Sequence, residues 1–84
     1  MSRIVSLFDK AAGTYSNPIV TASIGALTRI LSDEINRAEP TELFGQHPKD
    51  FDLYEIGIFD ETTGKIEPVS PTFLVALSSL VTKD

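Results

Sequence analysis

Apolar and polar positions near the N-terminus follow the period of a strand. Residues 4–8 (IVSLF) predict a first strand, and residues 9–13, which end in glycine, predict a reversal of the chain. Pro18 pushes the residue before it to extended geometry, so residues 19–21 predict a short second strand. Because proline cannot donate to a neighbouring strand, this strand belongs at the edge of a sheet.

The period then changes to that of a helix. Leu27, Leu31 and Ile35 recur at four-residue spacing, which predicts an amphipathic helix from Ser23 to about residue 37. The hydroxyl of Ser23, or that of Thr21, is a suitable cap for its first turn. The exposed side of this helix is predicted to carry Arg29, Asp33, Glu34 and Arg37.

The second half of the chain begins with a stretch that has no period. Residues 38–50 contain two prolines and a glycine and predict a connecting loop, which is long for a domain of this size. Residues 51–59 (FDLYEIGIF) are the strongest strand signal in the chain. Large apolar groups lie on both faces of this strand, which indicates a central strand or one used at an interface.

A predicted hairpin and a helix complete the chain. Residues 60–65 form the turn, with Gly64 in the left-handed conformation, and residues 66–69 return as a short edge strand that contains Pro68. Ser70 followed by Pro71 is typical of a helix start. One face of this C-terminal helix would carry Phe73, Leu74, Leu77, Leu80 and Val81. The predicted fold is a single α+β domain over residues 1–84, in the order β-β-α-β-β-α, with a mainly antiparallel sheet.

Composition is that of an ordinary globular domain. The chain has 84 residues, of which 42% are hydrophobic and 23% charged. A domain this small gains modest stability from its own core, so we expect it to bury further surface as a homodimer. Without cysteine it has no disulfide and no thiolate zinc site, which favours a reducing compartment, the cytoplasm. The sequence shows no signal peptide and no apolar stretch near the roughly 20 residues that span a bilayer, so we expect no membrane partner.

Candidate catalytic chemistry is sparse. The one histidine, His47, has no cysteine or clustered carboxylate at metal-ligand spacing, and it stands before a proline in a loop with no serine beside it. Residues 60–64 (DETTG) are faintly similar to the start of a calcium loop, but Pro71 stands where the closing glutamate is needed. No glycine-rich phosphate loop is present. We therefore expect neither enzymatic activity nor a cofactor or metal.

The net charge of −5 argues against nonspecific binding to duplex DNA, which depends on many cations. A single strand can instead be bound by a few cations together with aromatic side chains on which bases stack. The candidates for such a site are Arg3, Lys10, Tyr15, Arg29, Arg37, Lys49, Tyr54 and Lys65. The residues alone favour the other interpretation, in which Tyr15 and Tyr54 complete the packing of the sheet and the cations are scattered on the surface.

One segment resembles a known family. Residues 47–57 (HPKDFDLYEIG), followed by an acidic turn and Gly64, are similar to the signature of the small nonstructural protein of microviruses, the single-stranded DNA phages of the gokushovirus group. Residues 9–11, 18–19, 25–36 and 73–74 agree with that family in outline. Lys49 stands where the family usually has glutamate, and Asn17 where it often has proline.

The resemblance implies a virus-encoded protein of the host bacterial cytoplasm that acts in single-stranded DNA synthesis or packaging, often described as DNA-binding. It implies no catalytic residue. Two hypotheses follow. In the first, a homodimer binds single-stranded DNA in a groove lined by cations of both chains. In the second, which the acidic charge favours, the protein is an adaptor that binds a viral replication or capsid-assembly factor, or a host protein.

Overall fold

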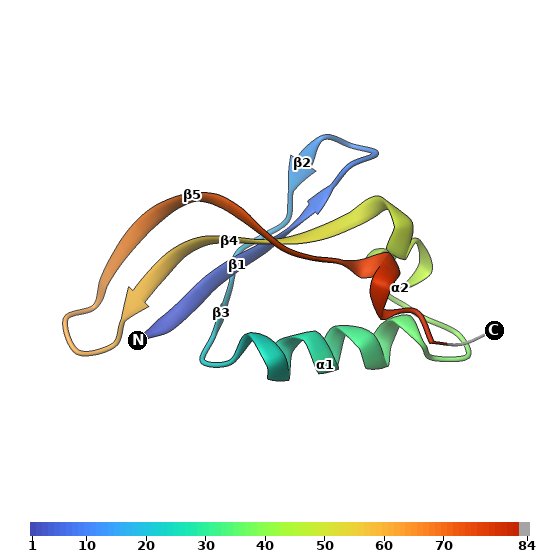
Figure 1. Cartoon of the computed structure of the whole chain (residues 1–84), viewed down its shortest axis with the longest axis horizontal. Helices are drawn as coiled ribbons and strands as arrows, with labels where there is room; N and C mark the ends of the chain where they lie inside the picture. The colour runs from blue at the N-terminus through green and yellow to red at the C-terminus, as the bar shows by residue number, and fades with distance from the viewer. Residues whose placement is uncertain (83–84) are drawn as a thin grey trace.

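A curved antiparallel sheet forms one layer of the molecule, and one long helix runs along a single side of it (Figure 1). The structure is a computed structural model that describes residues 1–82. Its sheet has the strand order β2-β1-β4-β5, and β3 pairs with β1 beside β2. The strands are β1 (Ser2–Asp9), β2 (Thr14–Tyr15), β3 (Ile19–Thr21), β4 (Phe51–Asp60) and β5 (Lys65–Ala76). The predicted α+β class is confirmed.

β4 is a central strand, as its two apolar faces predicted. It pairs with β1 along one edge and with β5 along the other, both antiparallel. One face carries Leu53, which is fully buried, in register with Leu7 of β1. Because side chains alternate along a strand, Tyr54 points to the other face. We call this second face, which α1 does not cover, the outer face of the sheet.

The helix α1 (Ile24–Ile35) covers the inner face. Its first turn is capped by Ser23, whose side-chain oxygen accepts a hydrogen bond of 3.1 Å from the backbone N–H of Ala26. Leu31 and Ile35 are buried on the face that the four-residue spacing predicted, and they pack in the same cluster as Leu53. The hydrophobic core therefore lies between α1 and the inner face of the sheet, and the side chains of the outer face are not part of this core.

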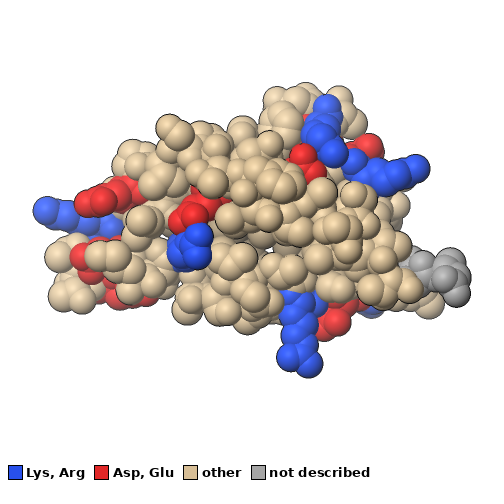
Figure 2. Space-filling view, viewed as in Figure 1, with Lys and Arg blue, Asp and Glu red and all other residues tan. Residues whose placement is uncertain are grey.

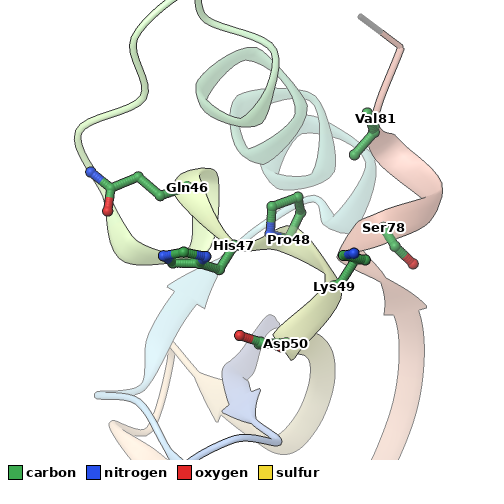
Figure 3. Close-up of a pocket in the computed structure, with 7 residues that line it drawn as sticks. All are labelled: Gln46, His47, Pro48, Lys49, Asp50, Ser78 and Val81. Carbon is green, nitrogen blue, oxygen red and sulfur yellow. The ribbon is translucent and has the colours of Figure 1, made fainter. Parts of the chain in front are cut away.

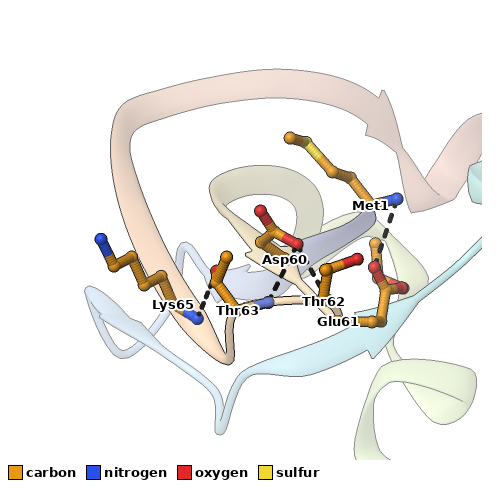
Figure 4. Close-up of polar contacts among 7 residues, drawn as sticks. Met1, Asp60, Glu61, Thr62, Thr63 and Lys65 are labelled. Atoms are coloured by element: carbon orange, nitrogen blue, oxygen red, sulfur yellow. Dashed lines mark hydrogen bonds and ion pairs between the residues drawn. The ribbon is translucent and has the colours of Figure 1, made fainter.

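Both hairpins are closed by the same turn. In each, an aspartate carboxylate accepts backbone N–H bonds from the second and third residues after it: Asp9 from residues 11 and 12, and Asp60 from residues 62 and 63 (Figure 4). A glycine with positive φ completes the turn, at 73° in Gly13 and 74° in Gly64. Asp60 thus holds the hairpin, and the DETTG segment is the turn that its glycine predicted.

The predicted C-terminal helix is wrong over most of its length. Residues 70–76 continue β5, and within the described residues that follow, 77–82, the only helical element is the 3-10 turn η2 (Leu77–Leu80). Ser70 and Pro71 lie within the strand, near a register shift of the β4–β5 pairing. Phe73 and Val75 have high strand propensity and pair with β4, so tertiary pairing prevails over the local helix-start signal. The predicted edge position of the Pro68 strand is confirmed.

The predicted loop 38–50 contains two short helices, α2 (Leu43–Gln46) and η1 (Pro48–Asp50). Glu34, expected on the exposed side of α1, is half-buried and fixes the approach to α2. Its Oε2 atom accepts backbone N–H bonds from Thr41 (2.8 Å) and Glu42 (3.1 Å), and the bond from Glu42 is the main reason that the pKa of Glu34 is lowered. Among residues 1–82 there is no helix long and apolar enough to span a membrane.

Candidate functional site

Four aromatic side chains lie together on the outer face of the sheet: the rings of Tyr15, Phe8 and Tyr54 all contact one another, with 5.8 Å between the Tyr15 and Tyr54 centroids, and Phe73 contacts Tyr54. Tyr15 of β2, Phe8 of β1, Tyr54 of β4 and Phe73 of β5 come from four adjacent strands. Ring centroids are 4.7 Å apart for Tyr15 and Phe8, 6.1 Å for Phe8 and Tyr54, and 5.9 Å for Tyr54 and Phe73. We call these four residues the aromatic stripe.

The rings of the stripe meet mostly edge to face. The interplanar angle is 79° between Tyr15 and Tyr54, 83° between Phe8 and Tyr54, and 82° between Tyr54 and Phe73. This is a favoured arrangement of aromatic pairs. The two ends of the stripe reach solvent, since Tyr15 is 45% exposed and Phe73 53%. These two residues are therefore the part of the stripe that a ligand can reach.

Two serines position the Tyr15 end of the stripe. Ser6 is fully buried, and its hydroxyl donates a 2.7 Å hydrogen bond to the carbonyl of Ser16. In return the side-chain oxygen of Ser16 accepts a 3.0 Å bond from the backbone N–H of Leu7. A buried hydroxyl has to be hydrogen-bonded, so this pair fixes the chain that follows Tyr15 against β1.

One charge pair lies on the same face. Asp52 is in register with Phe8, and its Oδ1 atom is 3.4 Å from Nζ of Lys10. That oxygen is buried and accepts no hydrogen bond from any residue that the structure describes, so the contact is electrostatic only. The carboxylate places a negative charge beside the stripe, and Lys10 offsets it.

The other predicted cations do not gather with the stripe. Arg3 forms a two-bond ion pair with Glu55 of β4, and its Nε donates at 2.7 Å. This hydrogen bond holds the pKa of Glu55 below its usual value. Along their strands, Arg3 and Glu55 alternate in phase with the residues that point into the core. Their side chains therefore lie on the inner face of the sheet, the side that α1 covers. Arg37 pairs with Glu34 at 2.9 Å, at the end of α1.

The last three predicted cations lie apart from one another, Arg29 on α1, Lys49 on η1 and Lys65 at the start of β5. None of the three forms an ion pair with a residue in 1–82. Figure 2 shows blue and red side chains interspersed over the visible surface, with no continuous positive stripe. The structure thus brings together Tyr15, Tyr54 and Lys10 out of the eight predicted positions.

A hollow of about 450 Å³ lies at the end of the molecule where η1 and η2 meet (Figure 3). Pro48 forms its middle, with His47 on one side and Lys49 and Ser78 on the other. The backbone N–H of Lys10 donates to the carbonyl of Asp50 at 2.7 Å, which joins this end to the strand that carries Phe8. His47 is exposed and ends α2, and no cluster of metal-ligating side chains is found among the described residues.

Two members of the stripe, Phe8 and Phe73, were missed by sequence reasoning. The alternation in β1 could have found Phe8, because it follows Leu7, a core residue, and so faces outward. The sequence predicts Phe73 on a helix face, and only its pairing with Tyr54 puts it on the outer face of the sheet. The stripe is a product of strand order, which no local pattern contains.

Comparison with known proteins gives one match. No curated protein and no solved structure is similar enough to be matched to the chain. Residues 2–80, which include every strand and helix described above, match a family of phage proteins. The match includes all four strands of the aromatic stripe and the segment 47–64. The chain therefore belongs to the phage ORF5 protein family.

Proposed function

We propose that this phage protein binds single-stranded DNA as a homodimer, during synthesis or packaging of a microvirus genome. The observation that carries the proposal is the aromatic stripe, which lies on a sheet face that no helix of residues 1–82 covers. Every base has a π-face, so exposed rings bind single strands with little dependence on sequence. The two most exposed rings, Tyr15 and Phe73, are the members of the stripe on which a base can stack.

The charges of the outer face set the expected strength of binding. Lys10 is the cation beside the stripe, and it is partly neutralised by Asp52. Because few phosphates are neutralised, stacking supplies most of the free energy and the salt dependence is shallow. A second copy of the chain adds a second set of rings and cations, which is the reason for placing function in the dimer.

A stacking variant tests the proposal. In a titration of a labelled single-stranded oligonucleotide, Tyr15→Leu removes one ring and keeps an apolar side chain. Loss of one stacked base costs about 1–3 kcal/mol, so affinity should fall about 5- to 150-fold. Ile66→Ala is the control, because Ile66 is 65% exposed on β5 and lies outside the stripe. Absence of binding by the unaltered protein at low salt, or equal affinity of the two variants, contradicts the proposal.

A second candidate function is an adaptor that binds a viral or host protein. It is favoured by the ion pairs that engage Arg3, Lys10 and Arg37 with carboxylates, together with the net charge of −5. An exposed aromatic stripe also suits a protein partner, since aromatic residues are enriched at interfaces. The titration separates the two, because an adaptor of this kind binds no oligonucleotide even at low salt.

A further inference from the structure

A second hollow, of about 270 Å³, lies between α2 and the hairpin formed by β1 and β2. Leu7 of β1 and Phe51 of β4, both nearly fully buried, line it from the inner side of the sheet. Leu43 and Phe44 of α2 line it from the other side, and Leu43 is 56% exposed. The hollow is smaller than the roughly 300–1,000 Å³ of sites for small molecules, so it suits one side chain of a partner.

Two carboxylates line this apolar hollow without a cation to offset them. Asp9 lies on the inner face because side chains alternate along β1, and its Oδ1 atom accepts the two N–H bonds of the turn. Glu42 precedes α2, and its side chain makes no capping hydrogen bond. Neither carboxylate forms an ion pair with a residue in 1–82, and no lysine or arginine is among the described residues that line the hollow. Lys10, the nearest cation in the chain, contacts Asp52 on the outer face.

The backbone on both sides of the hollow is held by hydrogen bonds. The N–H of Glu42 donates to Oε2 of Glu34 at 3.1 Å, and the carbonyl of Glu42 accepts from the N–H of Gly45 at 3.0 Å. Across the hollow, the carbonyl of Asp9 accepts a 2.7 Å bond from the N–H of Gly13. A ligand therefore meets a site that is already formed, which lowers the entropy cost of binding.

The ligand that fits apolar walls with carboxylates is a long side chain that ends in a cation. Its methylene groups cover apolar surface while the charged end reaches the carboxylates. Arginine fits better than lysine, because the guanidinium group is less strongly hydrated and stacks on aromatic rings, here those of Phe44 and Tyr15. A phosphate would be repelled, which excludes nucleic acid from this hollow. The net charge of −5 attracts a basic partner over longer distances.

We infer that this hollow binds an arginine side chain from a basic segment of a partner protein. The stem of the arginine lies against Leu43 and Phe44, and its guanidinium group contacts the carboxylates of Asp9 and Glu42. The site lies on the inner side of the sheet, away from the exposed rings of the stripe. It goes beyond DNA binding and does not depend on it.

An NMR titration of the whole chain tests the inference. The probe is the peptide Gly-Ser-Ala-Arg-Ala-Ser-Gly with both ends blocked, used up to millimolar concentration. The comparison peptide has citrulline, a neutral side chain of the same shape, in place of arginine. The arginine peptide should shift the amide resonances of residues 14–16 and 42–44 most. Loss of two exposed charge pairs should make the citrulline peptide bind about 4- to 25-fold more weakly.

A matched pair of variants locates the contact. Glu42→Gln should weaken binding of the arginine peptide about two- to fivefold, and the fold should tolerate it because this side chain is exposed and makes no capping bond. Glu67→Gln is the control, since Glu67 is an exposed glutamate of β5 that does not line the hollow. It makes the same change in net charge and should leave the affinity unaltered.

Four results overturn the inference: no binding of the arginine peptide, equal binding of the citrulline peptide, equal affinity of the two variants, or shifts centred elsewhere on the surface. Sedimentation equilibrium covers another occupant. If Glu42→Gln converts a dimer into a monomer, the hollow holds a second copy of the chain and the inference is wrong. None of these measurements uses DNA. A protein that binds the peptide here and binds no oligonucleotide would refute DNA binding and leave the inference intact.

Discussion

The ion pair between Lys10 and Asp52, beside the stripe, gives a prediction that separates the two candidate functions. Removing the Asp52 carboxylate should strengthen the binding of single-stranded DNA if the protein binds DNA, and should leave DNA unbound if the protein is an adaptor. Asp52→Asn removes the carboxylate 3.4 Å from Lys10 and keeps the shape of the side chain. The fold should tolerate the change. Lys10 is 46% exposed although Asp52 is only 13% exposed, so solvent screens the pair and it contributes about 0–1 kcal/mol. The oxygen next to Lys10 accepts no hydrogen bond from a described residue. The ammonium group of Lys10 is then free to contact a phosphate.

The magnitude follows from counterion release. Each phosphate contact to a single strand steepens the dependence of log K on log salt by about 0.7. One extra contact therefore adds a loss of about 2.6-fold between about 50 and 200 mM salt. If the two proteins bind equally at about 1 M salt, the variant binds about eightfold more tightly at about 50 mM.

The assay is a fluorescence titration of a labelled oligonucleotide at several salt concentrations. Asp33→Asn is the matched control, because Asp33 is an exposed carboxylate on α1, away from the outer face. It changes net charge by the same amount but frees no cation beside the stripe. If Asp52→Asn shows the same slope and affinity as Asp33→Asn, Lys10 is not at the DNA and the reasoning fails.

Three further predictions concern stability. Gly57→Ala should lower the free energy of unfolding by about 1–3 kcal/mol in a urea titration, because the added Cβ would lie 3.0 Å from the carbonyl oxygen of Glu67; an unchanged midpoint would contradict this packing. Gly25→Ala should instead raise it by up to about 1 kcal/mol, since the new methyl group meets nothing closer than 3.8 Å and alanine favours a helix; a lower midpoint would argue against that helical turn. The pKa of Glu61 is lowered to about 2, first by a hydrogen bond from the Ser2 hydroxyl and also by the N-terminal ammonium of Met1. The stability that ionised Glu61 contributes to the fold is therefore complete above about pH 4.5 and is lost as the pH falls toward 2. Glu61→Gln should then flatten the acid side of a plot of unfolding free energy against pH, and an unchanged plot would refute the contact.

The sequence by itself determined the elements whose signals are local. The helix at Ile24–Ile35 follows from the spacing of its apolar residues and from the Ser23 cap. Both turns follow from an aspartate four residues before a glycine, since carboxylate bonding and positive φ are properties of the turn alone. The central strand Phe51–Asp60 follows from apolar residues on both of its faces.

Only the tertiary structure decided the C-terminal segment and the site. Residues 70–76 carry a local helix signal, and they form a strand because β4 offers them a paired edge. Of the eight predicted binding residues, the fold places Tyr15, Tyr54 and Lys10 together and adds Phe8 and Phe73. The physical reason is that side-chain alternation is local, whereas the order of strands in a sheet is set by the packing of the whole chain.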